Sequence, residues 1–255
     1  MSTSNMGALP TRRPRLAESQ AEIADTGWMS LYKIGGAAAL LSAVFIPIQM
    51  IVFMAWPPPL AGTAGDWFRL FQTNRLIGLI DLDLLLVADN VLLIPILLAL
   101  YVTLRRASES LMAIATVLGI VAIVLFITSN PAIAMLSLSD HYAAATTDAQ
   151  RAIFLAAGQA VLAGWQGTAF QVGYLLSSVA GIAIPVVMLR GAIFSKAIAY
   201  LGILANAIGL GLYLPVIGLF LALFSVVFLE LWYILLGRRL LQLEQDAAKE
   251  ATKQH

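Results

Sequence analysis

The sequence contains no cysteine, only two histidines and few charged residues. Without cysteine, disulfides, thiolate nucleophiles and cysteine-ligated metals are excluded. Charged residues make up 11% of the chain, whereas a soluble domain typically has about 25%. The formal net charge is only +1, so nothing indicates binding to nucleic acid. What the chain does have is apolar residues, which form 60% of it.

The scarcity of histidine and the absence of nucleotide motifs remove most kinds of chemistry. The histidines are His141 and His255, so no pair at helical spacing is available to hold zinc or haem. Asp140 next to His141 is expected to be a solvated loop. The chain also has no glycine-rich loop of the kinds that bind nucleotides. We therefore expect no metal, cofactor or nucleotide, and no motif indicates a catalysed reaction.

Six long apolar stretches dominate the chain, and each approaches the roughly 20 residues that a helix needs to cross the bilayer. They cover residues 34–56, 76–104, 111–133, 169–189, 197–214 and 216–236. The sequence therefore predicts an all-α integral membrane protein, a bundle of six transmembrane helices. We expect a flexible cytoplasmic tail at 1–30, a transmembrane domain at 31–238 and a cytoplasmic C-terminal tail at 239–255.

The basic residues predict the orientation of the bundle, because cytoplasmic loops of membrane proteins are enriched in Lys and Arg. With the N-terminus inside, twelve of the fifteen basic residues fall on the cytoplasmic side. Those that fall outside are Arg69, Arg75 and Arg151. We expect both termini to be cytoplasmic, in the inner membrane of a bacterium.

Two outer segments are too short to cross the bilayer and are predicted to be interfacial helices. Residues 147–168 begin with Thr147-Asp-Ala-Gln150, a capping-box pattern. A seventh crossing there would move the later basic loops outside, which argues against it. The segment 66–71 is expected to rest on the membrane surface in the same way.

Small residues recur every fourth position in the fourth span, at Gly173, Ser177 and Gly181. This spacing allows close helix contact in membranes, so spans four and five are expected to pack in the bundle interior. Prolines interrupt spans one to four, and Asn130-Pro131 marks a point where span three loosens.

The second span carries the sharpest functional signal, a group of acids in an otherwise apolar helix. Asp81 and Asp83 are expected in the outer third of the membrane and Asp89 near its midplane. Asp83 and Asn90 differ by about 20° in direction around a helix and so share a face. A carboxylate in hydrocarbon costs several kcal/mol unless it is paired, hydrated or protonated. The functional interpretation is a proton or cation site.

The alternative is a structural role for the same acids. Asp81 and Asp83 would then lie in a wet entry zone near Arg75, and protonated Asp89 would bond Asn206 of span five. Glu230 of span six would pair with an arginine of an inner loop. No Lys or Arg lies within the apolar spans at the depth of these acids, so both interpretations stay open.

The second half carries a recognisable pattern. Trp165-Gln-Gly-Thr-Ala-Phe170-Gln-Val-Gly-Tyr174 leads into span four, Phe194-Ser-Lys196 opens span five, and Glu230-Leu-Trp232 lies in span six. The pattern resembles bacterial multipass proteins of the "domain of unknown function 4386" class. That resemblance implies a six-helix bacterial membrane protein and supplies neither a substrate nor catalytic residues.

Two classes of function fit these features. The first is passage of small solutes, cations or protons, using the acids of the second span. The second is a non-catalytic scaffold, sensor or accessory subunit, in which the acids hold helices together. In either case the expected partners are the lipid bilayer and another membrane protein or a second copy of the chain.

Overall fold

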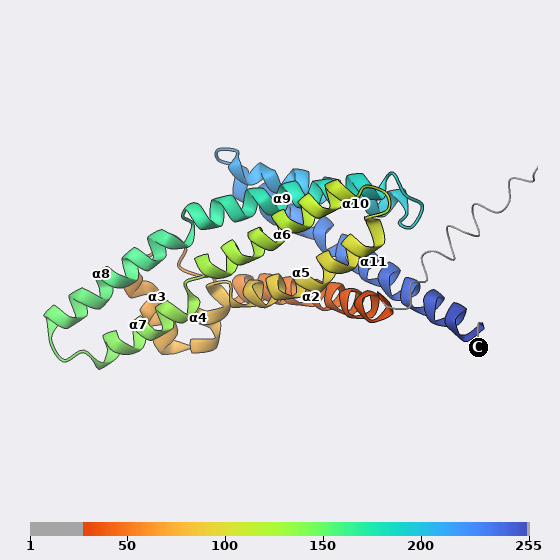
Figure 1. Cartoon of the computed structure of the whole chain (residues 1–255). Helices are drawn as coiled ribbons and strands as arrows, with labels where there is room; N and C mark the ends of the chain where they lie inside the picture. The colour runs from red at the N-terminus through yellow and green to blue at the C-terminus, as the bar shows by residue number, and fades with distance from the viewer. Residues whose placement is uncertain (1–27, 254–255) are drawn as a thin grey trace, which may run out of the picture.

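The computed structural model describes residues 28–253, and these residues form helices and turns without a strand. Figure 1 shows the longer helices side by side, with a group of shorter ones beyond one end and the C-terminus at the other. The elements in chain order are α2 (Met29–Ala55), α3 (Ala64–Thr73), α4 (Arg75–Asp81), α5 (Leu84–Leu104), α6 (Glu109–Ser129), α7 (Ala132–Ala144), α8 (Asp148–Trp165), α9 (Thr168–Met188), α10 (Lys196–Gly209), η2 (Leu210–Tyr213) and α11 (Gly218–Lys253).

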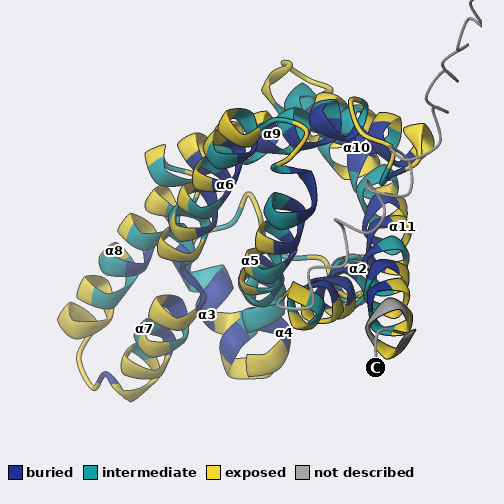
Figure 2. Cartoon of the chain, turned by 45° about the vertical axis from the view of Figure 1, so that its right-hand side comes forward, coloured by how far each residue is buried: buried dark blue, intermediate teal, exposed yellow. Residues whose placement is uncertain are grey.

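Within residues 28–253, six helical stretches are long and apolar enough to cross a membrane, as the hydropathy pattern predicts. Large apolar side chains cover their outward faces, for example Met54 at 80% exposure and Phe220 at 69%. Figure 2 shows these exposed outward faces. The helices are thus apolar on the outside as well as the inside, and a helix that is apolar all round suits lipid. These features are those of a multipass membrane protein.

The six spanning helices pack in a closed ring. Neighbouring helices pack in the order α2, α5, α6, α9, α10, α11 and back to α2, and α5 also contacts α9. The spans thus follow one another around the ring in chain order, and the contact of α2 with α11 closes it. The first span therefore packs against both the second, α5, and the sixth, α11.

Glycines set the distances at which α2 meets both of its neighbours. A Cβ placed on Gly35 would lie 2.7 Å from Ala99 Cβ of α5. A Cβ on Gly237 of α11 would lie 2.9 Å from the backbone oxygen of Gly36. Both are closer than real side-chain contacts, so the bare backbones permit this approach, as small residues do elsewhere in membrane bundles.

The small-residue stripe of α9 lies against two different helices. Gly173 faces α6, where an added Cβ would lie 3.2 Å from Leu125 Cβ. Gly181 faces α10, where an added Cβ would collide with the Asn206 amide. Ser177, between them, lines an internal cavity. Spans four and five pack directly on each other, and α6 shares the stripe with them.

The shorter helices α3, α7 and α8 form a second core beyond one end of the ring (Figure 1). Thr147 and Gln150 make the expected capping box at the start of α8. The apolar face of α3 does not face lipid. Its Trp67, Phe68 and Phe71 are each at most 1% exposed, because they pack against α7 and α8. The interfacial placement of these helices stays a prediction.

The predicted boundaries change at three places. Span two is not one helix, because it breaks between Asp81 and Leu84. The third span ends at Ser129, and Pro131 starts α7 instead of lying inside a helix. The sixth span continues as a helix to Lys253, into the segment expected to be a tail. Most of the predicted N-terminal tail lies outside the described residues.

Candidate functional site

The break in the second span places Asp83 in an unusual conformation. Its φ is 64° and its ψ is 28°, the left-handed region that few residues other than glycine adopt. Such backbone strain persists only where the surroundings hold it. Gln49 of α2 does this, because its Nε2 donates a hydrogen bond of 2.6 Å to Asp83 Oδ1. The carboxylate is therefore fixed at the start of α5.

A second helix break meets the first. Asn130 lies between α6 and α7, and its Nδ2 donates to the backbone oxygen of Leu82 at 2.7 Å. Its Oδ1 accepts from the backbone N–H of Ala132 at 3.0 Å. Backbone groups freed by broken helices are tolerated at membrane depth only where protein or an internal cavity satisfies them. One amide thus satisfies backbone groups at both breaks.

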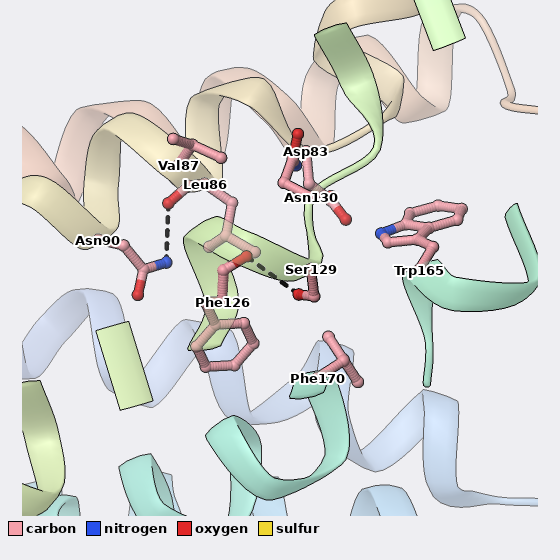
Figure 3. A pocket seen from close by; sticks show the side chains of 9 residues that line it. All are labelled: Asp83, Leu86, Val87, Asn90, Phe126, Ser129, Asn130, Trp165 and Phe170. Carbon is pink, nitrogen blue, oxygen red and sulfur yellow. Dashed lines mark hydrogen bonds between the residues drawn. The ribbon is translucent and has the colours of Figure 1, made fainter. Parts of the chain in front are cut away.

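A small cavity opens where the two breaks meet (Figure 3); it is called the outer cavity because the basic residues predict this end of the ring to be outside. The indole nitrogen of Trp165 points toward Asp83 and lies close to its carboxylate. The space open to a water molecule is about 10 Å³, enough for about one water. The wall is formed by Asp83, Leu86, Val87, Asn90, Phe126, Ser129, Asn130, Trp165 and Phe170.

A larger central cavity lies inside the ring, and Asn90 borders both cavities. The central space is about 60 Å³, enough for a few waters. Its wall comes from α5, α6, α9, α10 and α11, and is apolar except for Asn90, Ser177, Asn206, Trp232 and Tyr233. The Nε1 of Trp232 is buried without a hydrogen-bond partner, so a free donor borders this space.

Asp83 and Asn90 lie on the wall of one cavity, as their helical spacing predicts. Asn90 donates from Nδ2 to the Leu86 oxygen of its own helix at 2.8 Å. Asn90 is therefore the polar residue that borders both cavities.

Asp89 is buried on another side of α5, at 3% exposure. It lies about 8 Å along the helix from Leu84, at 1.5 Å per residue, so it belongs to the first part of α5 and not to its middle. The predicted bond to Asn206 is wrong. Asn206 Nδ2 instead donates to the backbone oxygens of Gly181 at 3.0 Å and Gly202 at 2.8 Å.

The wet entry zone expected near Arg75 and the arginine partner expected for Glu230 are also not observed. Arg75 pairs with Asp140 at 2.7 Å, and Asp81 is fully buried with neither carboxylate oxygen bonded. Glu230 has no arginine partner within the described residues, since both of its carboxylate oxygens are buried without a hydrogen bond. Arg239 instead donates to the backbone oxygen of Ile193 at 2.7 Å.

Two functional contacts could not be recognised in the sequence: Trp165 as a cavity wall, and Ser42 beside Asp89. Ser42 is fully buried in α2 and lies close to the Asp89 carboxyl, without the geometry of a hydrogen bond. A polar residue in an apolar helix was the available signal for Ser42, and the same signal indicates Gln49 as a partner of the span-two acids.

Metal chemistry has little support from the side chains. Within residues 28–253 no three His, Cys, Asp or Glu residues come together in a way that could hold a metal ion. The polar side chains on the cavity walls, among them Asp83, Asn90 and Tyr233, are instead separate donors and acceptors. Such groups can hydrogen-bond water, and a carboxylate among them can bind a proton.

Comparisons with protein-family models, with curated proteins and with solved structures give no match to this chain.

Proposed function

We propose that the six-helix ring is a passage for protons or small cations, with Asp83 at its outer entry. The observation that carries the proposal is the pair of cavities inside the ring that share Asn90 as a wall residue. Both cavities have polar groups on a mostly apolar wall, and the second span supplies the groups that join them. Ionisable residues inside a membrane bundle commonly mark ion and proton pathways.

The broken helix at Asp83 supports the same proposal. In many transporters, substrate and ion sites are formed where a membrane helix is interrupted. Here the interruption carries a carboxylate that three other segments surround: Gln49 binds it, Trp165 faces it, and Asn130 holds the adjacent backbone. The carboxylate would attract cations to the outer cavity.

The dimensions favour very small permeants. A central space of about 60 Å³ accommodates a few waters and excludes most organic solutes. Toward the other end of the ring the packing is tight, since Leu104, Met112, Met188 and Leu236 are each at most 1% exposed. The described state is therefore closed at that end, and conduction requires these side chains to move.

The proposed setting is a bacterial cytoplasmic membrane with both termini inside. It rests on the twelve basic residues of the predicted inner side. The end of the pathway that carries Asp83 would then open to the outside of the cell.

Flux into proteoliposomes tests this function. Purified protein is reconstituted with a pH-sensitive dye inside the vesicles, and a proton or Na⁺ gradient is applied. Wild type should conduct above protein-free vesicles, and Asp83→Asn should reduce the flux because it removes the entry charge. The matched control is Asp148→Asn, a fully exposed carboxylate outside both cavities. No flux from wild type, or equal flux from Asp83→Asn, would refute the proposal and leave the scaffold role.

A further inference from the structure

The ring brings two buried carboxyl groups from different helices together, Asp89 of α5 and Glu230 of α11. They are close enough for electrostatic interaction, and Tyr233 of α11 interacts with both. The packing of α2 explains the meeting. Gly35 of α2 faces α5, and Ser42 lies seven residues, or about two turns, further on the same face. On its other side, α2 faces α11.

The depths agree along α11 as well. Gly237 lies level with Gly36 and Leu40 of α2, and α11 runs antiparallel to α2. Glu230 precedes Gly237 by seven residues, about 10 Å along the axis. Ser42 follows Gly36 by six residues, about 9 Å in the same direction. Ser42, Asp89 and Glu230 therefore lie at about one level of the bundle.

Four oxygens at this level have no hydrogen-bond partner: Asp89 Oδ1, Glu230 Oε1 and Oε2, and Ser42 Oγ. Asp89 is 97% buried and Ser42 is fully buried, so bulk water does not satisfy them. A buried acceptor without a donor costs about 1–3 kcal/mol, and more when it is charged. Because no group of the protein satisfies these oxygens, they are available to bind a ligand.

The charge of the site selects the class of ligand. Two carboxylates bring two negative charges, and the apolar spans contain no Lys or Arg to balance them. Among the described residues, the ionisable groups that interact with Asp89 are Glu230 and Tyr233, while α2 contributes the uncharged Ser42. Calcium and magnesium need six or more oxygens in most sites, more than these groups provide. A monovalent cation fits the site better.

We propose that the carboxyl groups of Asp89 and Glu230, with the Ser42 hydroxyl, form a binding site for an exchangeable monovalent cation, a proton or Na⁺. The site deepens the proposed function, on which its role in passage rests, by naming where the permeant binds. Tyr233 connects it to the pathway, because its side chain also lines the central cavity. Tyr233 thus lies between the central cavity and the two carboxyl groups, on the route that a cation would take from the cavity to the site.

Binding is measured in detergent, where no flux is needed. The melting temperature is recorded from pH 5 to 9 in choline chloride, and then with increasing NaCl at fixed pH. If the pair binds protons, wild type loses stability as pH rises, because the folded state then binds more protons than the unfolded state. If it binds Na⁺, NaCl raises the melting temperature where choline does not. Either dependence supports the site and identifies the cation.

The variants are Asp89→Asn, Glu230→Gln and the two together. Each should reduce the dependence, and the double variant should show no more loss than the single ones if the two groups act as one site. Asp148→Asn and Glu109→Gln, both exposed, are matched controls and should keep it. If one variant fails to fold, the other still reports, because the carboxyls lie on different helices.

A wild-type dependence that both variants retain would overturn the site, as would a melting temperature that neither pH nor NaCl changes. The two proposals fail separately. If the variants lose cation binding but wild type conducts nothing, the passage is refuted and the site stands. Flux from wild type that Asp89→Asn and Glu230→Gln leave unchanged would keep the passage and refute the site.

Discussion

Replacing Gly237 with alanine tests the close contact between α2 and α11 that positions Glu230. The added Cβ would lie 2.9 Å from the backbone oxygen of Gly36 and 2.9 Å from Leu40 Cγ. The leucine can rotate away, but the backbone oxygen cannot, so the helices must separate. Such overpacking costs about 1–3 kcal/mol. The change should therefore destabilise the whole bundle.

Gly164→Ala is the matched control, because an added Cβ there has nothing within 4 Å. Both changes gain the roughly 0.5–1 kcal/mol by which a helix prefers alanine to glycine, so the difference between them isolates the overpacking. At about 2–4 °C per kcal/mol for a chain of this size, Gly237→Ala should melt roughly 2–12 °C below Gly164→Ala. The two melting temperatures are measured by tryptophan fluorescence of the purified proteins in detergent. Equal melting temperatures would refute the close packing of α2 on α11.

Two further predictions concern the outer and inner loops. Reporter fusions at Arg105 and Arg190 should be cytoplasmic, and fusions at Gly62 and Thr146 should be external. An external Arg190 would refute the six-span orientation. The pKa of Asp66 is lowered because the Thr63 backbone N–H and hydroxyl donate to its carboxylate, so this capping contribution is present at neutral pH and is lost as pH falls through the lowered pKa. Thr63→Val should raise the pKa of Asp66 part of the way back, as an NMR titration of that carboxyl would measure, and an unchanged pKa would contradict the capping interaction.

The spanning helices could be predicted from the sequence because their lengths and apolar composition are local properties. The capping box at Thr147 is local too, and so is the shared direction of Asp83 and Asn90, which follows from helical geometry alone. These features needed no knowledge of neighbouring helices.

The helix break at Asp83 could not be predicted in the same way. The apolar pattern runs through it, and the left-handed conformation is held by residues of other segments, Gln49 and Asn130. The meeting of Asp89 with Glu230 depends on the order of helices around the ring. The two helices that carry these acids, α5 and α11, both pack against α2. This arrangement comes from tertiary packing, which the local sequence does not reveal. The predicted partner Asn206 was wrong for the same reason.

Asn90 gives the most direct test of a passage through the ring, because it is the polar group shared by both cavities. Asn90→Leu keeps a similar size and removes the hydrogen-bonding group. A permeant that passes this point then lacks a partner, which costs about 1–3 kcal/mol. Val91→Leu, on the exposed face of the same helix, is the control. The measurement is proton or Na⁺ flux into proteoliposomes containing wild type, Asn90→Leu or Val91→Leu. The account predicts that Asn90→Leu conducts roughly 5- to 150-fold more slowly while Val91→Leu matches wild type, and equal flux from all three would contradict it.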